Sequence, residues 1–205
     1  MSKSPSEGVI KFKYNLKMGK PFEEKLYINI EKWRVILFKM NFIGEYLTEK
    51  VGYGNLSQRV QPGEMPFIIT GTQTGKWPHL NGSMYTKVTN CNMSKMTIDA
   101  IGPIAPSSES VTHHAIYEYG QKINCIFHVH HSELWNYMLR NNFDKTPPNI
   151  EYGTIEMARA MNSCINQKHS GIFVMAGHQD GIISYGSSAE EAGKILLDTL
   201  KESRK

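Results

Sequence analysis

The spacing of apolar residues along the chain predicts both strands and helices. Residues 9–17 alternate between apolar and polar side chains, which is the pattern of a strand with one solvated face. Residues 23–40 instead place apolar side chains three or four positions apart, which predicts an amphipathic helix. An apolar run at 66–70 predicts another strand, and the glycine-containing stretch 51–60 predicts a polar loop.

In the second half of the chain the spacing of apolar residues again predicts both strands and helices. The apolar run around His128 predicts a short strand, and Ser107 or Ser108 is placed to cap a helix over 109–119. The same periodicities predict a strand or turn pair at 93–102, helices at 134–139, at 154–166 and from Ser188 onward, and a buried hairpin at 172–183. Elements in this order predict an α/β fold in which helices pack on a sheet.

Composition limits the class of protein without naming a function. With 205 residues, 40% of them hydrophobic, the chain is long enough for one sizeable core and predicts a single domain. It has no apolar run of about eighteen residues and no signal-peptide pattern near residue 1, so we expect neither a membrane span nor export. The three cysteines match no zinc-binding spacing and indicate free thiols in a reducing compartment, the cytoplasm.

The charge of the chain is mildly positive. The formal net charge is +4, and several lysines lie near the N-terminus. Few arginines or aromatic residues lie among these lysines, so they favour a solvated surface over a nucleic-acid site. A weak attraction for anionic small molecules, such as a sugar phosphate, is also consistent with this charge.

A pair of histidines carries the strongest chemical signal. His128 and His130 stand two positions apart on a predicted strand, so both rings point to one face and can share a metal ion. A third ligand can come from His178, at the turn after the buried strand 172–176. Three histidines with an open fourth position are typical of catalytic zinc, with manganese or iron as the alternative. The other interpretation of the spacing is a chance pair of partly exposed histidines.

The start of the predicted helix 109–119 offers a candidate acid/base group. Glu109 occupies the first turn, where the field of the helix and nearby backbone N–H groups favour a carboxylate. The alternative interpretation is a solvated first-turn glutamate. His113 is one helical turn further on, and is either a partner of this site or a histidine satisfied in the core.

Short polar loops offer candidate donors to an anion. Asn55 lies in a glycine-flanked stretch, and residues 70–74 are rich in threonine. Ser107 and Ser108 add hydroxyls at a helix start, where phosphate groups bind well. Each of these patterns is also common in ordinary turns and helix caps.

Taken together and in order, these segments resemble the class II aldolase/adducin family over roughly residues 25–200. The matching segments are Gly54-Asn-Leu-Ser-Gln-Arg59, Phe67-Ile-Ile-Thr-Gly-Thr-Gln-Thr-Gly75, Pro106-Ser-Ser-Glu-Ser-Val-Thr-His113, Ile126-Phe-His-Val-His130, Gly153-Thr-Ile-Glu156 and His178 before Asp180-Gly181. The order of the motifs and their spacing around the histidines make the resemblance specific.

The resemblance implies a fold, an assembly and a site. It implies a three-layer α/β/α sandwich with a mainly antiparallel central sheet, and a homotetramer with active sites at the subunit interfaces. A divalent metal, zinc first, would be held by His128, His130 and His178, with Glu109 as the catalytic acid/base. The phosphate of a sugar substrate would bind the residues that match the family's phosphate site, which are Asn55, Thr72, Gln73, Ser107 and Ser108.

The activity that the resemblance implies is a lyase reaction. Relatives similar to this chain cleave a ketose phosphate, such as fuculose or rhamnulose 1-phosphate, by retro-aldol chemistry. A sugar-phosphate dehydratase or epimerase is the alternative enzyme on this fold, although epimerases of the family usually have Asp at the position of Glu109. A non-catalytic, adducin-like protein would be expected to have lost the metal ligands, which this chain keeps.

Three features depart from the family pattern. The segment 131–152 is shorter than in family aldolases, where it brings a proton-donor tyrosine to the neighbouring subunit. Tyr137 and Tyr152 are therefore the candidates for that donor in this chain. Gly52 stands where the family usually has threonine, and residues 1–22 form an N-terminal extension, with a strand, to the single domain 23–205.

Overall fold

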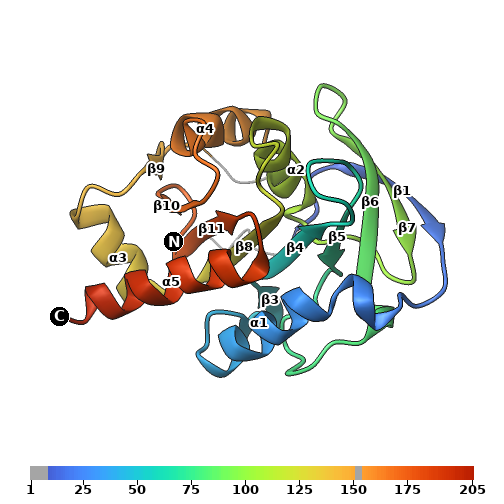
Figure 1. Ribbon diagram of the computed structural model, residues 1–205, viewed down its shortest axis with the longest axis horizontal. Helices are drawn as coiled ribbons and strands as arrows, with labels where there is room; N and C mark the ends of the chain where they lie inside the picture. Colours follow the sequence, from blue (N-terminus) through green and yellow to red (C-terminus); the bar gives the residue numbers. More distant parts are fainter. Residues whose placement is uncertain (1–8, 151–153) are drawn as a thin grey trace.

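The computed structural model describes residues 9–150 and 154–205, and the candidate donor Tyr152 lies outside these ranges. A nine-stranded sheet runs through the molecule (Figure 1). In spatial order its strands are β1 (Lys13–Met18), β7 (Thr97–Gly102), β6 (Tyr85–Asn92), β5 (Phe67–Thr70), β4 (Asn55–Arg59), β8 (Cys125–His130), β11 (Gly181–Gly186), β10 (Gly171–Met175) and β9 (Lys145–Thr146). A separate two-stranded hairpin consists of β2 (Gly44–Tyr46) and β3 (Val51–Tyr53).

The sheet is mixed, which corrects the expectation of a mainly antiparallel sheet. The pairings from β7 through to β10 are antiparallel, but β1 pairs with β7 in parallel and β9 pairs with β10 in parallel. The physical reason is the route of the chain. Helices and long loops separate the paired edge strands in sequence, and such crossovers permit parallel pairing whereas tight hairpins do not.

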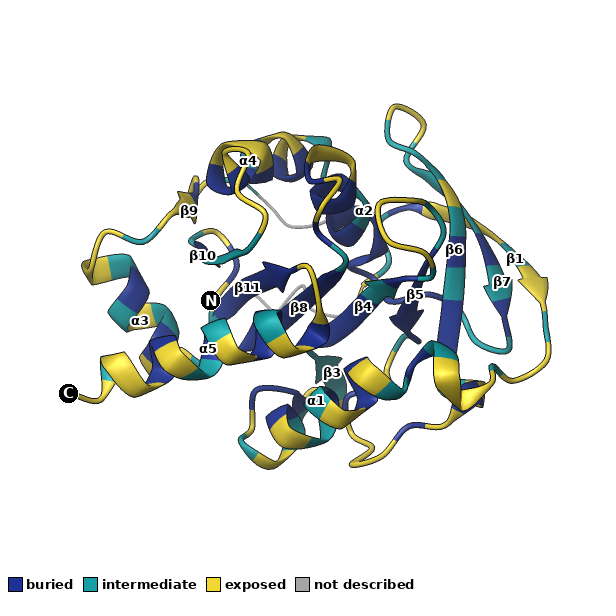
Figure 2. Ribbon diagram, viewed as in Figure 1, coloured by how far each residue is buried: buried dark blue, intermediate teal, exposed yellow. Residues whose placement is uncertain are grey.

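Helices cover both faces of the sheet (Figure 1). On one face lie α2 (Ser110–Tyr119) and α4 (Ile155–Ile165), and on the other lie α1 (Ile28–Lys39), α3 (Ser132–Arg140) and α5 (Ala189–Ser203). Short 3-10 turns at Glu24–Leu26 and Gly82–Met84 precede α1 and β6. Figure 2 shows α4 and α5 as buried on the side that meets the sheet and exposed on the outer side, whereas α2 is buried along most of its length.

Alternation along β8 divides the core into two parts. Ile126 belongs to the apolar cluster beneath α2 and α4, whereas Phe127 and Val129 belong to the cluster beneath α1, α3 and α5. His128 and His130 have the same strand parity as Ile126, so they lie on the face of α2. This face therefore carries the polar site within an otherwise apolar layer.

Most predicted elements are confirmed, with one exception that has a physical reason. Ser188 caps α5 through a bond from Glu191 N, as its sequence pattern predicts, and Thr154 caps α4 through a bond from Met157 N. The interpretation of 51–60 as a loop is wrong, because β4 is a central strand. Ser57 of this strand points toward α2, where its hydroxyl has two buried hydrogen-bond partners, His113 and Tyr117.

The N-terminal strand is confirmed with shifted bounds. It begins at Lys13 rather than at residue 9, and its partner is β7. Phe12, just before it, is buried in the core beneath α2 and α4, so this segment is packed onto the sheet. Among the helices within the described ranges, none has both the length and the apolar character that crossing a membrane requires.

Candidate functional site

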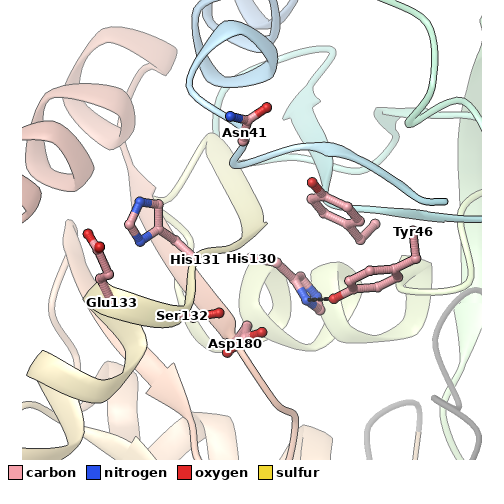
Figure 3. A pocket seen from close by; sticks show the side chains of 8 residues that line it. Asn41, Tyr46, His130, His131, Ser132, Glu133 and Asp180 are labelled. Carbon is pink, nitrogen blue, oxygen red and sulfur yellow. Dashed lines mark hydrogen bonds between the residues drawn. The ribbon is translucent and has the colours of Figure 1, made fainter. Parts of the chain in front are cut away.

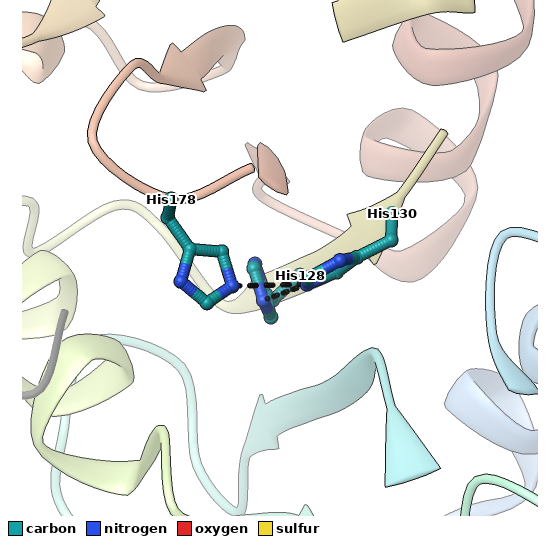
Figure 4. A group of neighbouring side chains, drawn as sticks. All are labelled: His128, His130 and His178. Carbon is teal, nitrogen blue, oxygen red and sulfur yellow. Dashed lines mark hydrogen bonds between the residues drawn. The ribbon is translucent and has the colours of Figure 1, made fainter. Parts of the chain in front are cut away.

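Three histidine side chains converge at one end of β8 (Figure 4). His130 Nε2 lies 3.1 Å from His128 Nε2 and 3.0 Å from His178 Nε2. His128 and His130 come from the same face of β8, as the alternation of a strand predicts, and His178 comes from the turn between β10 and β11. All three side chains are buried, so His128 and His130 are not a partly exposed pair.

The turn 175–181 holds His178 in place. His178 N donates to Met175 O at 3.0 Å, and Gly181 N donates to His178 O at 3.0 Å. Asp180 adopts a left-handed conformation with φ of 64°, which reverses the chain toward β11. Gly181 leaves room for the imidazole, since a Cβ there would lie 2.4 Å from His178 Cδ2.

Burial favours the neutral form of His128, a member of this cluster on β8. Desolvation, followed by the nearby His130 and His178, holds the pKa of His128 well below its ordinary value. Neutral imidazoles present lone pairs, which is what a metal ion requires. Two Zn–N bonds at a tetrahedral angle would separate their nitrogens by roughly 3.3 Å, close to the observed spacings. The residues therefore fit a divalent ion bound through Nε2.

A pocket of about 250 Å³ adjoins the histidine cluster on the side of His130 (Figure 3). Its lining residues are Asn41, Tyr46, Tyr53, His130, His131, Ser132, Glu133 and Asp180. Tyr46 Oη lies 2.9 Å from His130 Nδ1, and the Tyr53 ring centroid lies 5.6 Å from that of His130. The sequence interpretation missed both tyrosines, although Tyr53 directly precedes the Gly54-Asn55 motif.

Glu109 lies immediately before α2 and is fully buried, so the interpretation of a solvated first-turn glutamate is wrong. Its N–H donates to Ser107 Oγ at 3.3 Å, and its carbonyl oxygen accepts from His113 N at 3.0 Å. The strand beneath α2 is β4, in which Asn55 is the direct cross-strand partner of His128. Glu109 therefore begins a helix that packs on the same face of the sheet as the histidines.

His113 is a buried histidine of the α2 interface. Its Nδ1 lies 2.7 Å from Ser57 Oγ, which in turn lies 2.8 Å from Tyr117 Oη. Burial lowers the pKa of His113 to about 3, so the ring is neutral at ordinary pH. Of the two interpretations that the sequence left open, these contacts favour the core histidine.

The predicted phosphate-binding residues line one small pocket. Asn55, Thr72, Gln73, Ser107 and Ser108 are joined in its wall by Thr74 and by the glycines at 52, 54, 71 and 75. Its volume of about 10 Å³ is room for about one water molecule. A phosphoryl group is larger than this, so the wall would have to open to admit one.

Gln73 is the side chain that closes this pocket. Its Oε1 accepts from Gly52 N at 2.8 Å, and its backbone has a left-handed φ of 55°. The neighbouring Gly75 is pressed against strand β2, since a Cβ there would lie 2.1 Å from Gly44 O. Withdrawal of the exposed Gln73 side chain would free the Gly52 N–H for an anion.

Two buried charged residues of α1 bind the backbone of residues 74–80, which follow Thr72 and Gln73 in the chain. Arg34 Nη2 donates to Trp77 O at 2.5 Å and to Thr74 O at 3.1 Å. Glu31, one turn earlier, accepts from Leu80 N at 2.8 Å. Together they fix 74–80 by its backbone, so the position of Thr72 and Gln73 depends on α1.

Tyr137 stays a prediction as the proton donor to a neighbouring subunit. It lies on α3, where its ring packs against Phe143 with centroids 5.9 Å apart. The tyrosine hydroxyl that reaches the histidines within the described ranges belongs to Tyr46.

Comparison with known proteins adds a family and a set of similar folds. Residues 41–199 match the family model described as the class II aldolase and adducin N-terminal domain. Among curated protein sequences, none matches this chain.

Several solved structures share the fold at low sequence identity. YgbL from Klebsiella pneumoniae, described as a putative aldolase/epimerase/decarboxylase, is 20% identical, with a TM-score of 0.67 and coverage of 91% of this chain and 89% of that one. L-fuculose-1-phosphate aldolase from Thermus thermophilus is 18% identical, with a TM-score of 0.64 and coverage of 89% and 92%. A sugar-phosphate aldolase from Thermotoga maritima is 15% identical, with a TM-score of 0.69 and coverage of 88% and 93%.

Proposed function

The chain belongs to the class II aldolase and adducin family, and from this membership we propose that it is a metal-dependent lyase that cleaves a phosphorylated ketose by retro-aldol chemistry. One observation carries the proposal. Three buried imidazole nitrogens converge beside a strand whose first residue, Asn55, pairs with His128 and also lines the pocket of anion donors. A metal centre and a phosphate pocket are thus joined through adjacent strands.

The histidine cluster is the proposed metal centre. His128, His130 and His178 would hold a divalent ion, zinc by first expectation, through Nε2. Such an ion supplies positive charge at the substrate carbonyl when it is bound. The protein's part is to hold the three buried rings together, to which the turn at 175–181 contributes, and to keep His128 neutral by burial.

Glu109 is the proposed proton carrier. In the direction of bond formation it would take a proton from the carbon beside the carbonyl, and in cleavage it would return that proton to the same carbon. Its burial excludes bulk water as a competing proton donor. The carboxylate is set at the start of α2, directly after the two serines of the anion pocket.

The anion pocket is the proposed phosphate site. Ser107 and Ser108 offer hydroxyls, and the glycine-rich walls offer backbone N–H groups. Binding there would place the carbonyl end of the substrate toward the histidines and so reduce the entropy cost of the reaction. We propose that Gln73 withdraws from Gly52 when the phosphate enters.

The short segment 131–152 favours a second candidate function, because it is shorter than the segment that carries the donor tyrosine to a neighbouring subunit in family aldolases. A dehydratase or epimerase acting on a sugar phosphate would use the same metal centre without that particular donor. An adducin-like, non-catalytic role is disfavoured by the intact histidine cluster.

The proposal extends to organisation and assembly. We propose a three-layer α/β/α sandwich for residues 23–205, with 1–22 as an extension. By analogy with the family we also propose a homotetramer in the cytoplasm, acting on a small phosphorylated sugar rather than on nucleic acid or a membrane.

Elemental analysis of the purified protein tests the metal centre. Wild type is expected to hold about one divalent ion per chain, and the double variant His128→Ala/His130→Ala to hold none. His169→Ala is the matched control, because His169 is exposed and lies outside the cluster. Full metal occupancy in the double variant would rule out this site.

A panel of ketose 1-phosphates tests the reaction. Release of dihydroxyacetone phosphate by wild type, and its loss in Glu109→Gln with metal content unchanged, would support the lyase. Wild type that carries its metal and releases nothing from any member of the panel would contradict the lyase and leave the dehydratase or epimerase as the stronger candidate.

A further inference from the structure

We propose that Tyr46 is a positioning residue of the metal centre: its hydroxyl accepts the Nδ1 hydrogen of His130 and thereby holds Nε2 of that ring toward the other two histidines. The inference rests on the proposed metal centre and deepens it. Neither the family resemblance nor the spacing of the histidines points to Tyr46, which is 84 positions from His130 in sequence.

The hairpin that carries Tyr46 is built against His130. Gly44 pairs with Tyr53 and Tyr46 pairs with Val51 across the two short strands. The Tyr53 ring lies over Gly44, where a Cβ would come within 2.5 Å of its Oη. The Tyr46 and Tyr53 ring centroids are 4.6 Å apart, so each ring supports the other. The glycine at 44 therefore allows two tyrosines to stand together beside one imidazole.

The two nitrogens of His130 have separate tasks. Nε2 faces His128 and His178, at 3.1 Å and 3.0 Å, and Nδ1 faces Tyr46 Oη at 2.9 Å (Figures 3 and 4). When a metal takes the Nε2 lone pair, the neutral ring must carry its hydrogen on Nδ1. His130 is only 5% exposed, so that hydrogen needs an acceptor supplied by the protein. Tyr46 Oη is within bonding distance of it.

Tyr53 provides the matched control within the same hairpin. It lines the same pocket and packs near the same ring, but no hydrogen bond joins its hydroxyl to His130 within the described ranges. Tyr53→Phe therefore removes a hydroxyl from the same surroundings without removing the proposed acceptor. The comparison of Tyr46→Phe with Tyr53→Phe separates the role of the bond from the loss of a phenol.

The experiment is a competitive Zn²⁺ titration of metal-free protein against a chelating dye. Tyr46→Phe is expected to bind Zn²⁺ about 10- to 100-fold more weakly than wild type, and Tyr53→Phe about as tightly as wild type. The melting temperatures of the metal-free forms show whether either variant is simply less folded. Tyr46→Phe with an affinity within about twofold of wild type would overturn the proposal.

A second measurement needs no variant and covers the case in which Tyr46→Phe folds poorly. Long-range ¹H–¹⁵N spectra of the Zn²⁺-loaded wild type are expected to show the His130 hydrogen on Nδ1, protected from exchange with solvent. A rapidly exchanging Nδ1 hydrogen would overturn the role of Tyr46 while leaving the metal centre intact. Wild type that binds no Zn²⁺ would instead overturn the proposed metal centre, and with it this role.

Discussion

Ser57 Oγ lies 2.7 Å from His113 Nδ1, so a buried hydrogen bond joins the central strand β4 to helix α2. The same hydroxyl lies 2.8 Å from Tyr117 Oη, and Tyr117 Oη donates in turn to Asn124 O at 3.3 Å. This chain of polar contacts crosses an otherwise apolar layer. It fixes the helix that begins with Glu109 over the strand that begins with Asn55.

Replacement of Ser57 by alanine is expected to lower the free energy of unfolding by about 1–3 kcal/mol, because it leaves His113 Nδ1 buried without its partner. Denaturant titration measures the change. Ser94→Ala is the control, since Ser94 is exposed and its hydroxyl makes a solvent-exposed bond to Asn92 Oδ1, and it is expected to change little. Equal effects of the two substitutions would contradict the structural role of the Ser57 bond.

The pH dependence of stability should carry the signature of buried His113. Burial lowers the pKa of this ring from 6.5 to about 3, so between those values the unfolded chain binds a proton that the folded chain does not. The free energy of unfolding is not reduced by this group above pH 6.5. It falls as the pH is lowered from 6.5 toward 3, with a slope of up to about 1.4 kcal/mol per pH unit. His113→Gln should reduce the slope between pH 6 and pH 4 in urea titrations. An unchanged slope would exclude His113 as a contributor.

Local patterns predicted most of the helices, because their apolar faces repeat within a few residues. The polar residues of β4 could not be assigned in this way, since Ser57 is satisfied by His113, 56 positions away. The same limit applies to the metal centre. Strand alternation places His128 and His130 on one face, but Tyr46 reaches His130 from a hairpin of three-residue strands that has no marked hydrophobic pattern.

The edge pairings of the sheet show a further limit. Alternation over residues 9–17 predicted a strand, but alternation says nothing about which strand is its partner or about direction. The partner of β1 is β7, more than eighty positions away, in parallel register from Lys13 with Thr97 to Met18 with Gly102. Pairing at such distance is decided by the assembled core, in which Phe12 is buried, rather than by local sequence.

Replacement of Arg34 by methionine is expected to destabilise the protein by about 2–4 kcal/mol, because it removes the donor to the buried bond with Thr74 O and to the part-buried bonds with Trp77 O and Pro78 O. The substitution should also increase the hydrogen exchange of backbone amides in 72–80, because the guanidinium fixes this segment by bonds to its carbonyl groups. Lys32→Met is the control on the same helix, because Lys32 is exposed. Exchange in 72–80 that does not differ between the two variants would contradict this role of Arg34.

The cysteines should be unreactive in the folded protein. Burial raises the pKa of the Cys125 and Cys164 thiols to about 12, so at pH 8 only roughly one molecule in ten thousand carries each thiolate. A colorimetric disulfide reagent is expected to modify these thiols slowly in native buffer and rapidly in denaturant. Rapid reaction of Cys125 or Cys164 in the native protein, identified by peptide mapping, would show that the helices covering them open readily.

Strand β1 forms one margin of the sheet in the described structure, and its side chains are largely exposed (Figures 1 and 2). The backbone groups along the outer side of such an edge strand can hydrogen-bond to a strand of another molecule, which is the first step toward a fibre. Lys13 and Lys17 lie on the same face of this strand, so two molecules that met edge to edge would bring like charges together. Lys13 and Lys17 are therefore expected to oppose polymerisation. Replacing them with neutral residues is a direct route to a protein that precipitates on concentration while its interior remains unchanged.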